Sequence, residues 1–438
     1  MSLVIDTGKQ QPIWRRLKYT ASRQLADVNF PTVLLVTACR WPSATRLALA
    51  LTEAGFSVEA LCPARHSLAR ATFVSAVYRY RPLWPARSLR DGITRSNPDI
   101  IIPTDDFAAA HLHRLYKSIV PNSPANWLRT VIARSLGDPR KYSVLLSRAS
   151  IAALASEIGV ATPKVTRIRT EEQLARHLKL IGYPAVLKTD GSSGGLGVAI
   201  VENVHQAKAA FRRLSRPPSI AITLKRLIVD RDANLLLSAM LRRRSHVTIQ
   251  RFIRGKRANV AAACWKGRVL ASVCVEVLSS KKPTSSSTVV KVVTNTQMSR
   301  AAERLASALK LTGLCGMDFI IDENNRVHLI DFNPRATQTS HLVSSDGKDL
   351  LSALASELTG EPEIEQHRNP HRGPVVLFPH GFVQDATSPY SRFIDKDLPR
   401  DFPEFTEFGL DFRRETNRFL AKAIHYLRER WQTLVGRD

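Results

Sequence analysis

Apolar runs alternate with helical patterns in the first third of the chain. Residues 33–36 (VLLV) have no polar position, which is typical of a strand buried on both faces. The segment LALALTEAGFSVEAL (47–61) predicts a helix, a stop at Gly55 and a second strand. Residues 99–102 predict another buried strand. Strands and helices in this order predict an open, mostly parallel α/β sheet over residues 31–120.

Polar residues follow two of these strands, at Thr37 to Trp41 and at Thr104-Asp105-Asp106. Ligands of such sheets sit at the carboxyl ends of strands, so these residues are predicted to border a substrate site. The alternative, with equal weight, is that Asp105 and Asp106 only cap the helix that follows. The first loop lacks GxGxxG, which argues against a dinucleotide site.

The rest of the chain predicts shorter elements of both kinds. Residues 121–145 are interpreted as a connector, and 279–288 as a loop rich in Ser and Lys. Helices are expected at 147–158, 171–181 and 299–310. Strands are expected after Pro163, at 185–188, over most of 247–278 and in a hairpin at 315–333.

Composition supports a folded chain with an unusual charge. The chain has 438 residues, enough for two to four domains, and 44% of them are hydrophobic, which excludes a disordered polycation. The formal net charge is +26, from 64 Lys and Arg against 38 Asp and Glu. This excess points to polyanions, membrane phospholipid or phosphorylated small molecules as partners.

Several classes of protein do not fit the pattern. The first residues lack the apolar core of a signal peptide, and no apolar run approaches the roughly 20 residues of a membrane span. No CxxC pair occurs, so neither a zinc site nor a disulfide framework is expected. We therefore expect a reduced, cytoplasmic setting for the five cysteines, which are Cys39, Cys62, Cys264, Cys274 and Cys315.

The stretch YPAVLKTDGSSGGLGV (183–198) combines a strand, a lysine and a glycine-rich loop. Glycines let backbone N–H groups converge on phosphate oxygens, and a lysine at the strand end supplies a point charge. No GK[ST] closes the loop, so it is not a Walker A motif. A flexible hairpin loop has about the same weight. The candidate phosphate-binding residues are Lys188, Gly191, Ser192, Ser193, Gly194, Gly195 and Gly197.

The stretch GMDFIIDENNRVHLIDFNPR (316–335) predicts a hairpin with a two-residue turn at Asn324-Asn325. This turn pairs Asp318 with Asp331 and places Asn333 on the same face. The facing carboxylates would repel each other on a surface of apolar residues, and a divalent cation resolves the repulsion. Oxygen ligands suit Mg²⁺ bound with ATP phosphates. Separately solvated or salt-bridged acids are the alternative. The expected apolar surface consists of Ile320, Val327 and Leu329.

Together, and in this order, the two stretches resemble the ATP-grasp superfamily of carboxylate–amine or carboxylate–thiol ligases. The resemblance covers about residues 31–345 and implies an α/β fold, with α+β character in the ATP-binding part. An ATP-grasp fold would follow a Rossmann-like pre-ATP-grasp domain. The implied divisions are a basic arm (1–30), the pre-ATP-grasp domain (31–125), the ATP-grasp domain (141–345) with its lid (188–198) and metal hairpin (315–335), and an extension (346–438).

The resemblance also implies roles for single residues. Arg148 would contact ATP phosphate, with an exposed helix arginine as the alternative. Arg335 would act at the transferred phosphoryl group or the acyl-phosphate carbonyl, and Lys188 at the phosphates. Asp318, Asp331 and Asn333 would bind the metal. The hinge strand that reads adenine through its backbone would be Gln250, Arg251, Phe252 and Ile253.

Three positions depart from the family pattern. Glutamate is common where Gln250 stands and usual where Asp331 stands. An acidic ribose contact usually follows the glycine, but Gly255 precedes Lys256-Arg257, which leaves Asn259 as the candidate ribose ligand.

The activity implied by the resemblance is a ligase reaction with ATP and Mg²⁺, or Mn²⁺ in its place. A small-molecule carboxylate would become an acyl phosphate, which an amine or similar nucleophile then attacks. The alternatives are an ATP-grasp kinase that phosphorylates without ligation, and an ATP-binding regulatory protein.

A polyanion-binding protein is a further alternative, because residues 233–275 contain nine Lys or Arg and no acid. Aromatic residues are sparse there and no DNA-binding motif appears, so specific nucleic-acid binding is not expected. The basic amphipathic helix near 414–434 is expected to pack on its own domain; contact with a second copy in a homodimer, or with a membrane surface, is the alternative.

Overall fold

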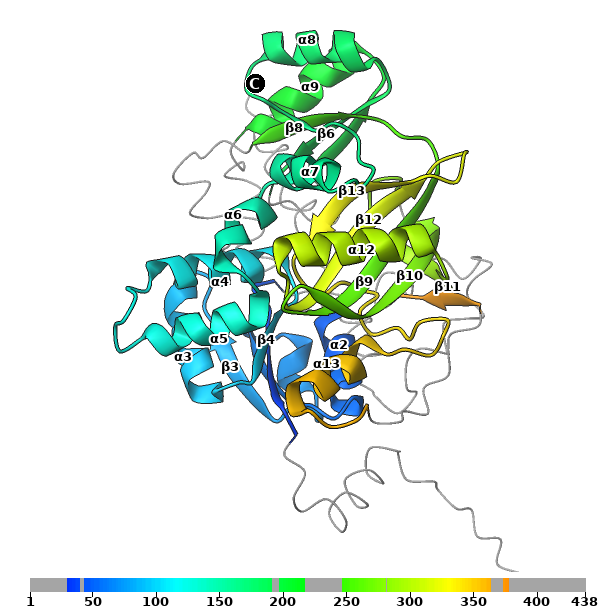
Figure 1. The fold of residues 1–438 in the computed structure, drawn as a ribbon. Helices are drawn as coiled ribbons and strands as arrows, with labels where there is room; N and C mark the ends of the chain where they lie inside the picture. Colours follow the sequence, from blue (N-terminus) through cyan, green and yellow to red (C-terminus); the bar gives the residue numbers. More distant parts are fainter. Residues whose placement is uncertain are drawn as a thin grey trace, which may run out of the picture.

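The computed structural model describes residues 30–39, 43–190, 197–216, 246–280, 282–363 and 373–377. Three sheets with their helices make up these ranges (Figure 1). The predicted basic arm, most of the glycine loop, residues 233–245 and the predicted helix near 414–434 lie outside the described residues. Among the helices of the described ranges, none has both the length and the apolar character needed to cross a membrane.

The first sheet is parallel and has the strand order β3-β2-β1-β4. The side chains of β1 alternate between two cores, because Leu34 and Val36 pack on one face and Val33 and Leu35 on the other. This double burial explains the unbroken apolar run and confirms the predicted parallel sheet. Its elements are β1 (Thr32–Val36), α2 (Ser43–Glu53), β2 (Ser57–Pro63), η1 (Ser67–Arg70), β3 (Ala76–Tyr80), α3 (Pro85–Ser96), β4 (Ile100–Pro103) and α4 (Asp106–Ser118).

The predicted connector at 121–145 is largely helical, which corrects the sequence interpretation. Helix α5 (Asn126–Leu136) packs against β4, and η2 (Pro139–Lys141) and α6 (Tyr142–Leu145) follow it. Helix α5 begins after Ala125, which makes no side-chain capping hydrogen bond, so the usual sequence signal for a helix start is missing.

A small antiparallel sheet with the order β5-β8-β6-β7 forms the lobe that carries Lys188 (Figure 1). Helices α8 and α9 pack against this sheet and close a small apolar core. The elements are α7 (Arg148–Glu157), β5 (Thr166–Ile168), α8 (Glu171–Ile181), β6 (Ala185–Thr189), β7 (Val198–Val201), α9 (Val204–Ser215) and β8 (Val247–Arg251).

The third sheet has six strands in the order β13-β12-β9-β10-β11-β14. Helices α12 and α13 cover opposite faces of it. Helix α12 begins three residues earlier than predicted, because the side chain of Asn295 caps it by accepting from Met298 N. The elements are β9 (Lys256–Trp265), β10 (Arg268–Ser280), β11 (Ser287–Val293), α12 (Thr296–Leu309), β12 (Gly313–Ile321), β13 (Val327–Asn333), α13 (Leu350–Thr359) and β14 (Pro374–Val376).

A glycine joins the small sheet to the six-stranded sheet. Gly255 lies between β8 and β9 at a φ of 154°, and a Cβ atom there would stand 2.1 Å from the carbonyl oxygen of Ile321. Only glycine fits so close to another backbone. The crossing between the two sheets is therefore tied to the end of β12.

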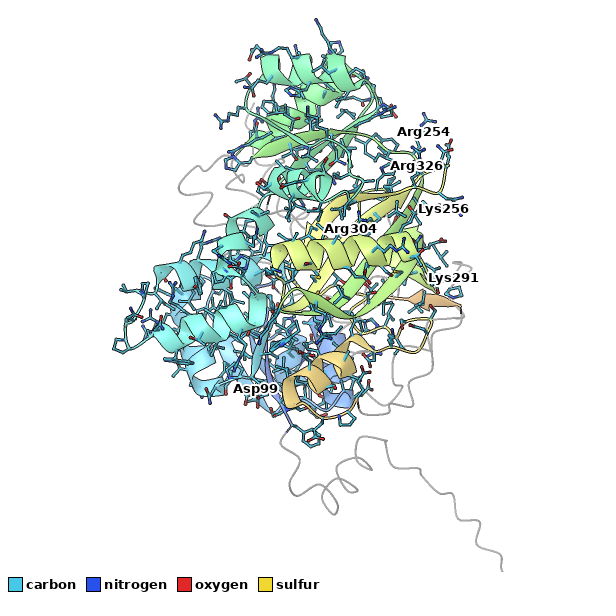
Figure 2. All side chains as sticks on the ribbon, in the orientation of Figure 1. Asp99, Arg254, Lys256, Lys291, Arg304 and Arg326 are labelled. Carbon is cyan, nitrogen blue, oxygen red and sulfur yellow. The ribbon has the colours of Figure 1, made fainter. Side chains whose placement is uncertain are left out.

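Part of the excess positive charge lies outside the space between the sheets. Arg254 and Lys256 at the β8–β9 crossing and Arg326 at the β12–β13 turn are exposed, and they lie near one another (Figure 2). None of the three lines the cleft described below.

Two histidines of α4 are buried in the core of the parallel-sheet region. The Nδ1 atom of His111 forms a hydrogen bond of 2.6 Å with the Tyr80 hydroxyl. His113 stacks on Tyr142 with ring centroids 3.9 Å apart. Burial, helped by the nearby cations Arg114 and Lys117, lowers the pKa of His111 to about 4 and that of His113 to about 3.

We expect the two histidines to make the protein less stable in weak acid. Their unfolded pKa is about 6.5, so above that pH both states are neutral and stability does not change. As the pH falls from 6.5 towards about 4, only the unfolded chain takes up the protons, which costs up to about 1.4 kcal/mol per pH unit for each histidine. Thermal unfolding from pH 8 to 5 measures this slope. His113→Phe, which keeps a stacking ring, should flatten it, whereas replacing the exposed His205 should not; an unchanged slope in His113→Phe would contradict the assignment.

Candidate active site

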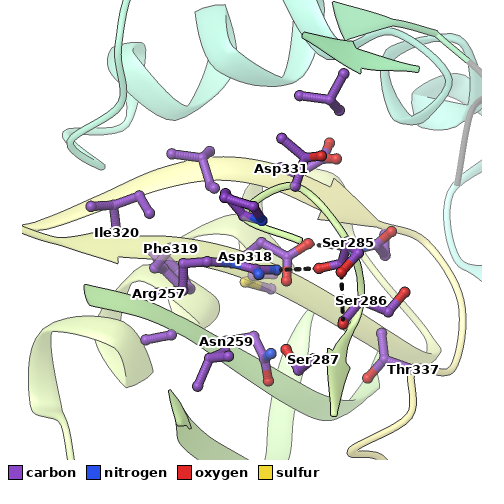
Figure 3. A pocket seen from close by; sticks show the side chains of 18 of the residues that line it. Arg257, Asn259, Ser285, Ser286, Ser287, Asp318, Phe319, Ile320, Asp331 and Thr337 are labelled. Carbon is purple, nitrogen blue, oxygen red and sulfur yellow. Dashed lines mark hydrogen bonds between the residues drawn. The ribbon is translucent and has the colours of Figure 1, made fainter. Parts of the chain in front are cut away.

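A cleft of about 260 Å³ lies between the small sheet and the six-stranded sheet (Figure 3). It brings together residues that are far apart in the chain, such as Arg148 and Arg335, which are 187 positions apart. The predicted site residues that line it are Arg148, Lys188, Gln250, Phe252, Ile253, Asp318, Asp331, Asn333 and Arg335.

The predicted pairing of Asp318 with Asp331 is confirmed, but the predicted two-residue turn is wrong. The connection between β12 and β13 runs over residues 322–326, where Asp322 Oδ1 accepts from two backbone N–H groups and Asn325 has a φ of 57°. This longer loop shifts the register by one residue, so that Phe319 faces Leu329. A bulge then restores the register, and Asp318 faces Asp331.

The bulge also changes the surroundings of the acids. Val327 and Leu329 were expected beside the carboxylates, but both are buried in the core on the other side of the hairpin, while Ile320 borders the cleft. The extra residue is Ile330, whose carbonyl oxygen accepts from Lys188 Nζ at 2.5 Å. The irregular pairing thus lets the backbone of β13 bind the lysine of the small lobe.

The two facing carboxylates have opposite pKa shifts. Burial and the neighbouring charge of Asp331 raise the pKa of Asp318 above its ordinary value. Burial also raises the pKa of Asp331, but Arg148 and Lys188 lower it by more, so it ends below its ordinary value. Asn333 Nδ2 donates to Asp318 Oδ2 at 3.2 Å. The hairpin thus holds Asp331, which is paired with cations, and Asp318, whose charged form is disfavoured by burial and by the charge of Asp331.

These residues fit a divalent metal ion. Asp318 and Asp331 provide oxygen donors of the kind that Mg²⁺ prefers, and the amide of Asn333 carries a third such oxygen, which in this structure accepts from Arg335. A cation between the acids would also remove the repulsion that raises the pKa of Asp318. Within the described ranges, no group of three His, Cys, Asp or Glu side chains forms another candidate metal centre.

Lys188 lies near the end of β6, at the cleft, and is only 5% exposed. Its side chain points across the cleft to β13, where the Ile330 carbonyl accepts its hydrogen bond. Burial and the nearby Arg148 lower the pKa of Lys188, although Asp331 acts in the opposite direction. A buried cation of this kind is stabilised by an anion bound in the cleft.

Arg148 is the first residue of α7, and Ser147 caps this helix by accepting from Ser150 N. The Arg148 guanidinium donates from Nε and from a terminal nitrogen to the two Asp331 oxygens, at 3.2 and 3.1 Å. It also donates to the Thr189 carbonyl. In this structure the arginine and the hairpin carboxylate therefore neutralise each other.

Arg335 meets the parallel-sheet region. Its guanidinium donates to both carboxylate oxygens of Asp106, at 2.8 and 3.3 Å, and to Asn333 Oδ1 at 3.1 Å. Asp105, in contrast, caps α4 by accepting from Ala108 N. The two acids thus divide the roles that the sequence left open: Asp105 caps the helix and Asp106 pairs with the arginine.

The predicted hinge strand contributes only part of its residues. Gln250, Phe252 and Ile253 line the cleft beside an apolar wall formed by β6 and β7. Arg251 is exposed and lies outside the cleft. The Phe252 backbone N–H donates to the Pro184 carbonyl at 3.3 Å. The wall consists of Val186, Val198 and Ile200.

Most of the glycine loop lies outside the described residues, including Gly191, Ser192, Ser193, Gly194 and Gly195. Gly197 lies at its end, where its carbonyl accepts from Thr189 N at 2.9 Å. This bond places the two ends of the loop beside Lys188.

The cleft also contains residues to which the sequence analysis gave no role. Arg257 donates to Ser280 Oγ at 3.1 Å and to the Ser285 carbonyl at 2.8 Å, and so connects both sides of the β10–β11 loop (Figure 3). Asn259, the candidate ribose ligand, lines the cleft opposite Asp318. The only sequence signal for Arg257 is its position two residues before Asn259, because alternate residues of a strand point to the same face. The remaining polar residues of this end are Ser285, Ser286, Ser287, Thr337 and Thr339.

Residues 147–362 match the family model described as "Carbamoyl-phosphate synthase L chain, ATP binding domain". A carbamoyl phosphate synthase large chain from Haemophilus ducreyi is 22% identical over 265 residues, which are 60% of this chain and 22% of that one. A formate-dependent phosphoribosylglycinamide formyltransferase from Prochlorococcus marinus is 29% identical over 156 residues, 34% of this chain and 36% of that one. The chain thus spans about a fifth to a third of the length of these curated relatives.

Two solved structures share the fold. The biotin carboxylase domain dimer of 2-oxoglutarate carboxylase from Hydrogenobacter thermophilus, in complex with MgADP, ADP and bicarbonate, has a TM-score of 0.56 at 19% identity, covering 79% of this chain and 74% of that one. N5-carboxyaminoimidazole synthase from Aspergillus clavatus, in complex with ADP and 5-aminoimidazole ribonucleotide, has a TM-score of 0.53 at 12% identity, covering 77% and 79%.

The resemblance drawn from the two motifs is confirmed by these comparisons. The match over residues 147–362 bears out the resemblance to the ATP-grasp superfamily for that part of the chain. The described residues have a mixed α/β fold, which the two solved structures share.

Proposed function

We propose that this protein is an ATP- and Mg²⁺-dependent ligase that activates a substrate carboxylate as an acyl phosphate for attack by an amine or similar nucleophile. The observation that carries the proposal is the single cleft in which Lys188, Arg148 and Arg335 surround the acidic hairpin. A cluster of three cations around two facing acids suits a nucleotide triphosphate bound with its metal. The small-molecule substrates would be the carboxylate and its nucleophile.

Asp318, Asp331 and Asn333 would hold Mg²⁺. When bound, the ion would neutralise phosphate charge and orient the γ-phosphate. Arg148, which is paired with Asp331 in this structure, would donate to phosphate oxygens when a nucleotide is bound. The Arg148–Asp331 ion pair would therefore be exchanged for two pairs, metal with carboxylate and arginine with phosphate.

The reaction would need no nucleophile from the protein. A carboxylate oxygen of the substrate attacks the γ-phosphorus and ADP leaves; the amine nitrogen then attacks the acyl carbon, inorganic phosphate leaves and the nitrogen loses a proton. Lys188 and Arg335 would stabilise the transferred phosphoryl group, and the chain would act by positioning and charge. In agreement, no histidine or cysteine is among the described residues that line the cleft.

The remaining parts would complete the site. The apolar wall and the hinge residues Phe252 and Ile253 would hold adenine. The glycine loop would cover the phosphates and exclude water from the acyl phosphate. Residues 31–125 would serve as the Rossmann-like pre-ATP-grasp domain, a role supported by the parallel sheet whose α4 reaches Arg335. A cytoplasmic location would agree with five cysteines that form no disulfide in the described part of the chain.

A screen for ADP release tests the function. Amino acids, hydroxy acids and bicarbonate are offered with MgATP, alone and with amines, and hydroxylamine is added to trap an acyl phosphate as its hydroxamate. We expect ADP release that depends on one carboxylate, requires Mg²⁺ and yields a hydroxamate. A stable phosphorylated product that resists hydroxylamine would identify a kinase instead. Binding of MgADP without any turnover across the screen would favour a regulatory ATP-binding protein.

A further inference from the structure

The guanidinium of Arg335 is held from several sides by the protein itself. It donates to Asp106 Oδ1 at 2.8 Å, to Asp106 Oδ2 at 3.3 Å, to Asn333 Oδ1 at 3.1 Å and to the Ala336 carbonyl at 3.0 Å. Asn333 and Ala336 are its neighbours in sequence, whereas Asp106 is 229 positions away. The bidentate contact with Asp106 fixes the plane of the guanidinium as well as its place.

Asp106 is itself held firmly. It follows Asp105, whose carboxylate accepts from Ala108 N, from Ala38 N at 2.7 Å and from the Thr37 hydroxyl at 3.0 Å. These bonds fix the start of α4 against the end of β1. A second anchor lies beside the arginine, where Ala336 N donates to the Pro103 carbonyl at 3.0 Å. Two separate sets of hydrogen bonds, those of the Asp105 carboxylate and that between Ala336 and Pro103, thus bring the acid and the arginine together.

The contact is partly shielded from water. The Arg335 side chain is 16% exposed and that of Asp106 is 25% exposed. Burial lowers the pKa of Arg335, but Asp106 raises it by more, so the arginine stays charged. The orientation of the arginine extends to the hairpin, since Asn333 accepts from Arg335 and donates to Asp318. A continuous path of hydrogen bonds therefore leads from α4 to the acidic hairpin.

We propose that Asp106 is a positioning residue, which holds Arg335 in the orientation that the reaction requires. This inference rests on the proposed ligase function. It means that the parallel-sheet region takes part in the phosphoryl-transfer site through one carboxylate. Asp106 acts through the arginine, because its own oxygens are engaged by the guanidinium.

The test compares Asp106→Asn and Asp106→Glu with a matched control in the same region. Asp91→Asn is the control, because Asp91 pairs with Arg87 at 3.7 Å on the exposed surface of α3. For Asp106→Asn we expect kcat to fall by about 10²-fold, which is the cost of a small misplacement, while the KM for ATP changes less than twofold because Lys188 and Arg148 are untouched. Asp106→Glu should recover part of kcat, and the control should match the natural protein.

A second readout needs no turnover. Phenylglyoxal modifies accessible arginines, and peptide mass spectrometry follows Arg335 itself. The Asp106→Asn change should increase the modification rate of Arg335 at least fivefold and leave that of Arg87 unchanged. If the natural protein shows no ligase turnover, the proposed function fails, and the modification rate still decides on Asp106.

Two outcomes would overturn the inference. One is an Asp106→Asn protein with unchanged kcat and unchanged Arg335 modification. The other is an equal loss of kcat, of MgADP affinity and of the thermal midpoint, without rescue by glutamate, which would indicate a purely structural role.

Discussion

Replacing Lys188 by alanine should abolish ATP turnover while the fold stays intact. The lysine is buried at the end of β6 and reaches across the cleft to the Ile330 carbonyl, so it has the place and the charge to bind a phosphate oxygen. Removing one such stabilising group from a shielded site costs about 10² to 10³ in rate. The affinity for ADP should fall as well, since a phosphate bound there would contact the lysine before and after the reaction.

ADP release and a MgADP titration measure these two effects. Lys208→Ala is the matched control, because Lys208 is an exposed lysine on α9 of the same lobe. Circular dichroism and the thermal midpoint report on the fold. Normal turnover in a folded Lys188→Ala protein would refute the site assignment.

Replacing Asp331 by alanine should also abolish turnover, for a different reason. The carboxylate would hold the metal ion, and it also pairs with Arg148. Its loss should lower the rate by at least about 10³-fold, because the metal and the alignment of the phosphates are lost together. Arg148 then keeps only its 4.0 Å pair with Asp190, and Lys188 loses the Asp331 charge beside it, so binding of ATP without metal should persist or strengthen.

Turnover and nucleotide binding at several Mg²⁺ concentrations separate these effects. Asp331→Glu should keep activity, because glutamate carries the same donor on a longer arm. Asp346→Ala is the control, since Asp346 forms an exposed pair with Lys348 outside the cleft. Mg²⁺-dependent turnover that survives in Asp331→Ala would show that the metal binds elsewhere.

The proposed exchange of ion pairs explains why the two replacements should differ. Arg148 and Asp331 bind each other, and both would be needed by the nucleotide and its metal. Metal and phosphate would therefore bind most favourably together, because either one alone leaves a buried partner without its counter-charge. Lys188 instead donates to the Ile330 carbonyl, so its loss should weaken phosphate binding directly.

Much of the fold could be predicted because the signals are local. The strand at 33–36, the helix at 171–181 and the strand ending at Lys188 each show their period within a few residues, and all three appear in the structure. Helix α5 was missed because the residue before it makes no capping bond. Its burial against β4 stabilises it, and that contact is not encoded in its own segment.

For the candidate site, the sequence by itself determined which chemical groups face each other within one element. Strand alternation brings the two hairpin acids together, and a strand end carries the lysine. Only the tertiary structure decided the rest. The bulge that turns the Ile330 carbonyl to Lys188 depends on the length of the loop, and the pairing of Asp106 with Arg335 depends on how two sheets pack. The physical reason is that the repeat of a strand or helix sets only which of its own side chains share a face. Contacts between distant elements form because those elements bury apolar surface against each other.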